Sequence, residues 1–90
     1  MNVRYTEIAL REVSEILSYI AERNVPAAQG IADRLERLLV LLGEFPLIGY
    51  STDEYAVRVI PVVGYPFLIF YTVKDEVVIL HVRHAAQLRP

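Results

Sequence analysis

The chain has 90 residues, of which 54% are hydrophobic, eleven are acidic, nine are lysine or arginine and none is cysteine. This length suits one domain over residues 1–90 with one core, and the lack of cysteine excludes disulfides and thiolate metal sites and favours a reducing, cytoplasmic location. The net charge of −2 lacks the positive surplus with which proteins hold phosphate backbones, so we expect no direct sequence-specific binding of nucleic acid.

The first predicted elements are a short strand at Val3–Tyr5 and a helix that follows it. The hydroxyl of Thr6 can cap this helix, and Glu7 places a favourable charge in its first turn. Apolar residues at spacings of three and four predict one buried stripe, formed by Leu10, Val13, Ile16, Leu17 and Ile20. The helix should end near residues 23–24. Because charges interrupt this segment throughout, we expect no secretory signal.

A second helix is predicted between Pro26, which suits a first turn, and Gly43, which suits the end of a helix. Its buried stripe is Ile31, Leu35, Leu38, Leu39 and Leu42. Val40 and Leu41 lie off the stripe, so we expect them to form a contact surface for a partner. Gly30 suggests a close approach to the first helix. The short connection between the two helices predicts an antiparallel hairpin.

The remaining residues read as a loop over residues 45–54 followed by an antiparallel meander. Three segments are rich in Val, Ile, Phe and Tyr and predict its strands: residues 55–60, 67–74 and 77–83. The long apolar stretch Val59–Val73 contains two prolines and a glycine and is shorter than the roughly 20 residues of a membrane helix. We therefore expect no membrane span.

The middle strand of this meander is apolar on both of its faces. Phe67, Ile69 and Tyr71 alternate onto one face, while Leu68 and Phe70 alternate onto the other. One helical hairpin can cover only one face, so a protein partner is predicted to cover the second. We expect four residues to contact this partner: Tyr65, Phe67, Ile69 and Tyr71. Pro66 stiffens the chain beside Tyr65, which favours it as an anchor point.

The order of these elements, together with four sequence segments, resembles the RelE/ParE superfamily of bacterial toxins over nearly the whole chain. The segments are Pro46–Gly49, Arg58, Gly64–Tyr71 and Val77–His84. The Tyr-Pro-Phe-Leu-Ile-Phe-Tyr run and the Val-Arg-His-Ala-Ala run are more similar to the ParE branch. The resemblance implies an α+β fold with a short N-terminal strand, an antiparallel helical hairpin and a three-stranded antiparallel meander.

The same resemblance implies the toxin of a type II toxin–antitoxin pair, neutralised by a cognate antitoxin that wraps it with an extended or helical tail. ParE-like toxins act on DNA gyrase by binding and stabilising a broken-DNA state, with no bond chemistry and no cofactor. The sequence departs from the family at two positions where arginine is common, Tyr50 and Gln87.

Two other interpretations remain open. A RelE-like, ribosome-dependent messenger RNA endonuclease would use Arg58 and Arg83 to hold the scissile phosphate and His84 to exchange a proton. If Arg58 has only a structural role, it would pair with an acid such as Glu54 or Asp75.

The third interpretation is a non-toxic interaction module of the same fold. Two histidines without thiols make a poor metal site, so we predict no metal.

Overall fold

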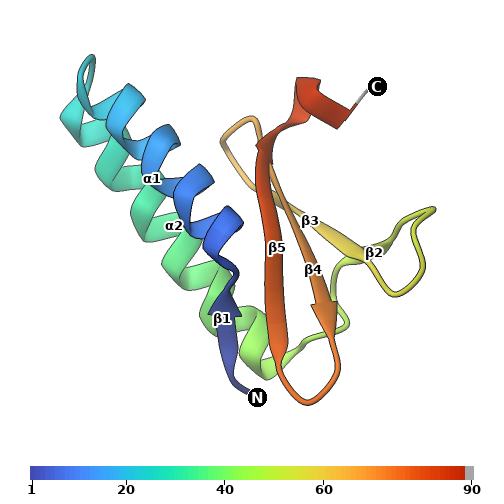
Figure 1. The fold of residues 1–90 in the computed structure, drawn as a ribbon. Helices are drawn as coiled ribbons and strands as arrows, with labels where there is room; N and C mark the ends of the chain where they lie inside the picture. Colours follow the sequence, from blue (N-terminus) through green and yellow to red (C-terminus); the bar gives the residue numbers. More distant parts are fainter. Residues whose placement is uncertain (89–90) are drawn as a thin grey trace.

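The computed structural model describes residues 1–88, with the backbone alone at residues 87–88 (Figure 1). The elements, in order, are β1 (Val3–Tyr5), α1 (Glu7–Ala21), α2 (Val25–Glu44), β2 (Tyr50–Ser51), β3 (Arg58–Val62), β4 (Phe67–Val73), β5 (Val77–His84) and the 3-10 helix η1 (Ala85–Leu88). The predicted order of strand, helical hairpin and meander is confirmed. Among the described residues, no helix combines the length and apolar character needed to cross a bilayer.

Both helices begin at capping residues that the sequence supplies. The Thr6 hydroxyl accepts a hydrogen bond from the Ala9 N–H at 3.1 Å, as predicted. The Asn24 side chain does the same for the Ala27 N–H at 3.1 Å, and Pro26 lies in the first turn of α2. These caps satisfy backbone donors that have no partner inside a helix. Residues 22–24 are therefore a tight connection, and the helices form the expected hairpin.

Two details of the helices differ from the sequence-based expectation. Leu10 is 55% exposed, because α1 turns Ala9 and Val13 toward the core instead. Gly30 makes room for a residue of the β3–β4 turn and not for α1. A Cβ atom at Gly30 would lie 2.5 Å from the hydroxyl oxygen of Tyr65, so any larger residue there would push Tyr65 away.

The sheet has five strands in the order β1-β5-β4-β3-β2. β1 lies parallel to β5, and the other neighbours are antiparallel. The two-residue strand β2 was predicted as loop. β3 begins at Arg58 and continues through Pro61, whereas the prediction was residues 55–60; Tyr55 lies before it and is 96% exposed. Pro61 lies beyond the end of β2, where β3 is an edge strand and tolerates proline.

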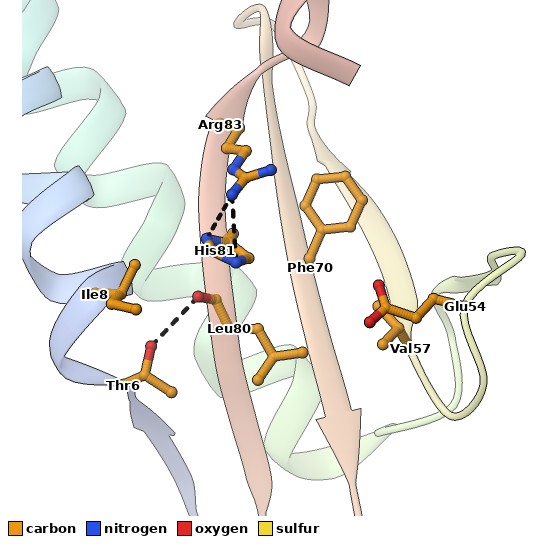
Figure 2. Close-up of a pocket in the computed structure, with 8 residues that line it drawn as sticks. All are labelled: Thr6, Ile8, Glu54, Val57, Phe70, Leu80, His81 and Arg83. Atoms are coloured by element: carbon orange, nitrogen blue, oxygen red, sulfur yellow. Dashed lines mark hydrogen bonds between the residues drawn. The ribbon is translucent and has the colours of Figure 1, made fainter. Parts of the chain in front are cut away.

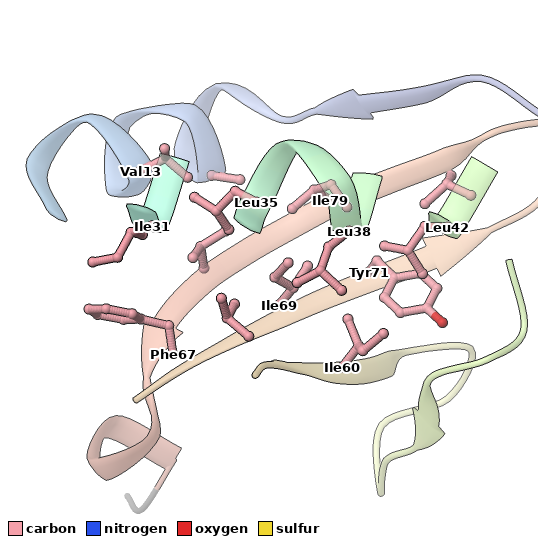
Figure 3. Close-up of a cluster of buried hydrophobic side chains, with 14 residues drawn as sticks. Val13, Ile31, Leu35, Leu38, Leu42, Ile60, Phe67, Ile69, Tyr71 and Ile79 are labelled. Atoms are coloured by element: carbon pink, nitrogen blue, oxygen red, sulfur yellow. The ribbon is translucent and has the colours of Figure 1, made fainter. Parts of the chain in front are cut away.

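The two helices cover one face of the sheet and enclose the core (Figure 3). From the sheet, Ile69, Tyr71 and Ile79 have no exposed surface, and Leu35, Leu38 and Leu42 of α2 pack against this face. This arrangement corrects the prediction for three residues. Phe67, Ile69 and Tyr71 are 8%, 0% and 0% exposed, so they lie beneath the helices and not on a surface that a partner can reach.

The opposite face of the sheet carries no helix (Figure 1). Its residues alternate with those of the core and are only half-buried; they include Val59, Leu68, Phe70, Val78 and Leu80. The open apolar face predicted from the middle strand is therefore present. In β4 it is formed by Leu68 and Phe70, and not by Phe67, Ile69 and Tyr71, which we expected a partner to contact.

Candidate functional site

A hollow of about 340 Å³ lies on the open face (Figure 2). Phe70 of β4 and Leu80 of β5 form its apolar floor. Figure 2 shows Ile8 of α1 on one side and Glu54, in the β2–β3 loop, on the other. This loop is closed by Thr52, whose N–H and hydroxyl both donate to the carbonyl oxygen of Val57, at 3.1 and 2.9 Å. The hollow therefore combines an apolar floor with fixed walls.

An irregularity between β4 and β5 directs two consecutive residues onto the open face. Tyr71 lies opposite Ile79, but Phe70 lies opposite His81, so Leu80 is an extra residue in β5. Ile79 and Val82 on either side remain in the core, at 0% and 2% exposed. Such a bulge re-aims side chains that strict alternation would separate. Here it brings Leu80 and His81 into the same hollow.

A carboxylate from α1 organises the upper end of the hollow. β1 ends opposite Ile79, and beyond this point the Val82 N–H donates to Glu12 Oε1 at 3.1 Å. The same carboxylate lies 3.2 Å from His81 Nδ1 and 3.5 Å from Arg83 Nε. Glu12 thus takes the place of a neighbouring strand and fixes the side chains of His81 and Arg83. Sequence analysis missed Glu12 because about 70 residues separate it from its partners.

Arg58 does not contact the hollow but binds the backbone of the α2–β2 loop. Arg58 is in β3, opposite Tyr71 of β4, on the helix-covered side of the sheet. Its Nη1 donates to the carbonyl oxygens of Leu47 and Gly49 at 3.2 and 2.8 Å. The sequence suggested an acidic partner for Arg58, such as Glu54. The α2–β2 loop instead supplies backbone acceptors close enough to hold the guanidinium.

The three residues of the endonuclease interpretation do not converge. Arg83 lies opposite Leu68 on the open face, whereas His84 lies opposite Phe67 and packs edge-on against its ring, with 5.7 Å between the ring centres. Arg58 in β3 pairs with Tyr71 of β4, whereas His84 in β5 pairs with Phe67 of β4. At the usual rise per residue, these two positions of β4 are about 13 Å apart along the strand. Arg83 is thus separated from the other two by the sheet itself.

The remaining predicted contact residues have mixed positions. Val40 and Leu41 on α2 are 61% and 40% exposed and are available to a partner. Tyr65 is half-buried against the core and packs over Gly30. The side chain of Gln87, at which the sequence departs from the family pattern, lies outside the described part of the structure.

Comparisons with known proteins identify the family of this chain. Residues 3–89 match the family model described as ParE toxin of type II toxin-antitoxin system, parDE. A Sinorhizobium fredii protein named "Putative toxin Y4kP" is 32% identical over 88 residues, which span 98% of this chain and 92% of that protein. A solved structure of the chromosomal ParDE TA system from P. aeruginosa shares the fold, with a TM-score of 0.80 and 19% identity over 93% of this chain and 95% of that one. The chain therefore belongs to the ParE toxin family of type II toxin–antitoxin systems.

Proposed function

We propose that this ParE toxin inhibits DNA gyrase in the cytoplasm by binding to it, without bond chemistry of its own. The observation that carries the proposal is the separation of Arg58, Arg83 and His84. Cleavage of a phosphodiester needs its phosphate-holding and proton-transferring groups within hydrogen-bond reach of one substrate. Arg58 is instead engaged with the α2–β2 loop, and Arg83 with Glu12 and His81. Such an arrangement suits a protein that acts through its surfaces.

The open face is the proposed site of the cognate antitoxin. Its hollow offers an apolar floor, a polar end at His81 with the cationic Arg83, and an acidic wall at Glu54. This chemistry suits a tail that places a large apolar side chain on Phe70 and an acidic side chain near Arg83. Val40 and Leu41 on α2 are a proposed second contact for a tail that wraps around the toxin.

A supercoiling assay with purified gyrase tests the proposed target. We expect micromolar toxin to inhibit supercoiling and to leave cleaved DNA that is still attached to gyrase. Toxin incubated beforehand with its antitoxin is the matched control and should leave gyrase fully active. Unimpaired supercoiling by a toxin preparation that arrests growth would contradict gyrase as the target.

The same toxin preparation distinguishes gyrase inhibition from the endonuclease and from the non-toxic module. Messenger RNA cleaved in the ribosomal A site, with translation restored by Arg83→Ala, would replace this proposal with the endonuclease. Expression in bacteria with no growth defect would replace it with a non-toxic module.

A further inference from the structure

The loop between α2 and β2 is held from beneath by two side chains of the sheet. The buried Tyr71 hydroxyl accepts from the Gly49 N–H at 2.9 Å and donates to the Pro46 carbonyl oxygen at 2.8 Å. Arg58 donates to the carbonyl oxygens of Leu47 and Gly49. Gly49 must stay glycine, because a Cβ atom there would lie 2.9 Å from the Val59 carbonyl oxygen and would collide with the Tyr71 ring. Four hydrogen bonds thus fix one short loop.

This firmly held backbone presents apolar side chains to the outside. Four large residues in or beside the loop form what we term the apolar knob: Phe45, Leu47, Ile48 and Tyr50, which are 55%, 62%, 43% and 71% exposed. Residues 45–52 contain no charge. An exposed apolar group that is already ordered loses little conformational entropy on binding, which is the property of an interface anchor. Basic residues, with which a nucleic acid would be held, are absent from this segment.

The apolar knob and the hollow on the open face are different surfaces. Tyr71, which anchors the loop, points into the core beneath the helices, whereas its neighbour Phe70 forms the floor of the hollow. None of the residues that line the hollow belongs to the knob. A segment confined to the hollow would leave Leu47 and Ile48 exposed.

The exposure of the apolar knob indicates which kind of partner it fits. Exposed apolar side chains lose the most contact with water when they enter a concave pocket. A single extended or helical tail has no pocket of its own, whereas a folded protein does. The rigid loop also needs no partner to give it its conformation, since Tyr71 and Arg58 already do so.

We propose that the apolar knob is the contact that binds an apolar pocket on the toxin's folded protein target, and that it is separate from the antitoxin site. This inference rests on the proposed function only in that the toxin acts by binding to a protein. It holds for gyrase or for another folded target.

The test compares the double variant Leu47→Ser/Ile48→Ser with Val63→Ser, in the full chain. Val63 lies in the β3–β4 turn and is 62% exposed, so it is a matched apolar control. For each protein we would measure growth arrest on induction, the concentration that half-inhibits gyrase supercoiling, and the dissociation constant for the antitoxin. The double variant should lose inhibition about tenfold or more, as expected for an interface anchor. Its antitoxin affinity should stay within about twofold, and Val63→Ser should behave as wild type.

Three outcomes would overturn the inference: a double variant that arrests growth as wild type does, one that loses antitoxin affinity as strongly as inhibition, or a wild-type dimer that the double variant dissociates. Failure of the proposed function gives a different pattern. If wild type arrests growth but leaves gyrase active, gyrase is the wrong target; relief of arrest by the double variant would then still support the knob.

The role of the rigid backbone has its own test. Tyr71→Phe removes the hydroxyl but keeps every knob side chain. Amide exchange at Gly49 should accelerate, and inhibition should weaken severalfold at a temperature where the variant is fully folded. Unchanged inhibition alongside faster Gly49 exchange would show that preorganisation of the loop has no part in target binding.

Discussion

The two faces of the sheet are built from alternate residues of the same strands, but one face is buried beneath the helices and the other is partly exposed. On the helix-covered face, Ile69 and Tyr71 of β4 are fully buried. On the open face, their neighbours Leu68 and Phe70 are only half-buried. Both pairs are apolar. The position of α1 and α2, and not the composition of β4, decides which pair belongs to the core.

This difference separates stability from binding. Residues beneath the helices contribute to folding through the apolar area that they remove from water. Residues on the open face keep part of that area exposed, so a partner that covers them gains it on association. Substitutions on one face should therefore change the free energy of unfolding, and substitutions on the other should change affinity.

The largest expected effect comes from adjacent residues on opposite faces. Ile69→Ala should lower the free energy of unfolding by about 2–5 kcal/mol, because it leaves a cavity in the core. Leu68→Ala should cost roughly 1 kcal/mol, since the side chain is already partly in water. Urea denaturation measures both values. Equal losses for the two variants would remove the distinction between the faces.

The next effect concerns affinity. Phe70→Ser removes the aromatic floor of the hollow and should weaken antitoxin binding by about tenfold or more, at a lower cost in stability than Ile69→Ala because Phe70 is only half-buried. Val63→Ser, which removes an exposed apolar side chain that does not line the hollow, should bind as wild type. Isothermal titration calorimetry of the three proteins decides the matter. Wild-type affinity in Phe70→Ser would place the antitoxin elsewhere.

A smaller effect is expected at the edge of β5. Glu12→Ala should destabilise the fold by about 1–2 kcal/mol, because the partly buried Val82 N–H loses its acceptor. Glu12→Gln keeps an acceptor oxygen and should cost less. Thermal unfolding compares the two. If glutamine is as damaging as alanine, the charge toward His81 and Arg83 matters more than the backbone hydrogen bond.

The smallest expected effect is on thermal stability, comes from Tyr5 and appears only at alkaline pH. Burial raises the pKa of the Tyr5 phenol above its ordinary value of about 10. The unfolded chain therefore releases this proton first, so the associated stability is complete below about pH 10 and is lost as pH rises through the folded-state pKa. Tyr5→Phe should flatten this decline when melting temperatures are compared between about pH 9 and 11. An identical slope in both proteins would assign the decline to other groups.

Much of the fold could be predicted from the chain alone, because local chemistry determines it. Thr6 and Pro26 mark helix starts through backbone geometry that applies in any protein. The spacing of Ile31, Leu35, Leu38 and Leu42 correctly identified the buried side of α2. The resemblance to ParE toxins over nearly the whole chain is confirmed by the match of residues 3–89 to that family.

The rest depends on contacts between distant residues, which no local pattern encodes. Two residues are too few to show alternation, so β2 was missed at Tyr50–Ser51. With both faces of β4 apolar, alternation separated Phe67, Ile69 and Tyr71 from Leu68 and Phe70 but could not say which set the helices cover. The bulge at Leu80 and the reach of Glu12 to β5 likewise follow from packing.

The central claim, that the antitoxin covers the helix-free face, is tested most directly by methyl NMR on the complex. Toxin with labelled leucine and valine methyl groups would be titrated with unlabelled antitoxin. We predict large chemical-shift changes for the methyl groups of Leu68 and Leu80 on the open face. The methyl groups of Val25, which is 55% exposed at the start of α2, should not change. Shifts confined to the outer surface of the helices, with Leu68 and Leu80 unchanged, would contradict the account.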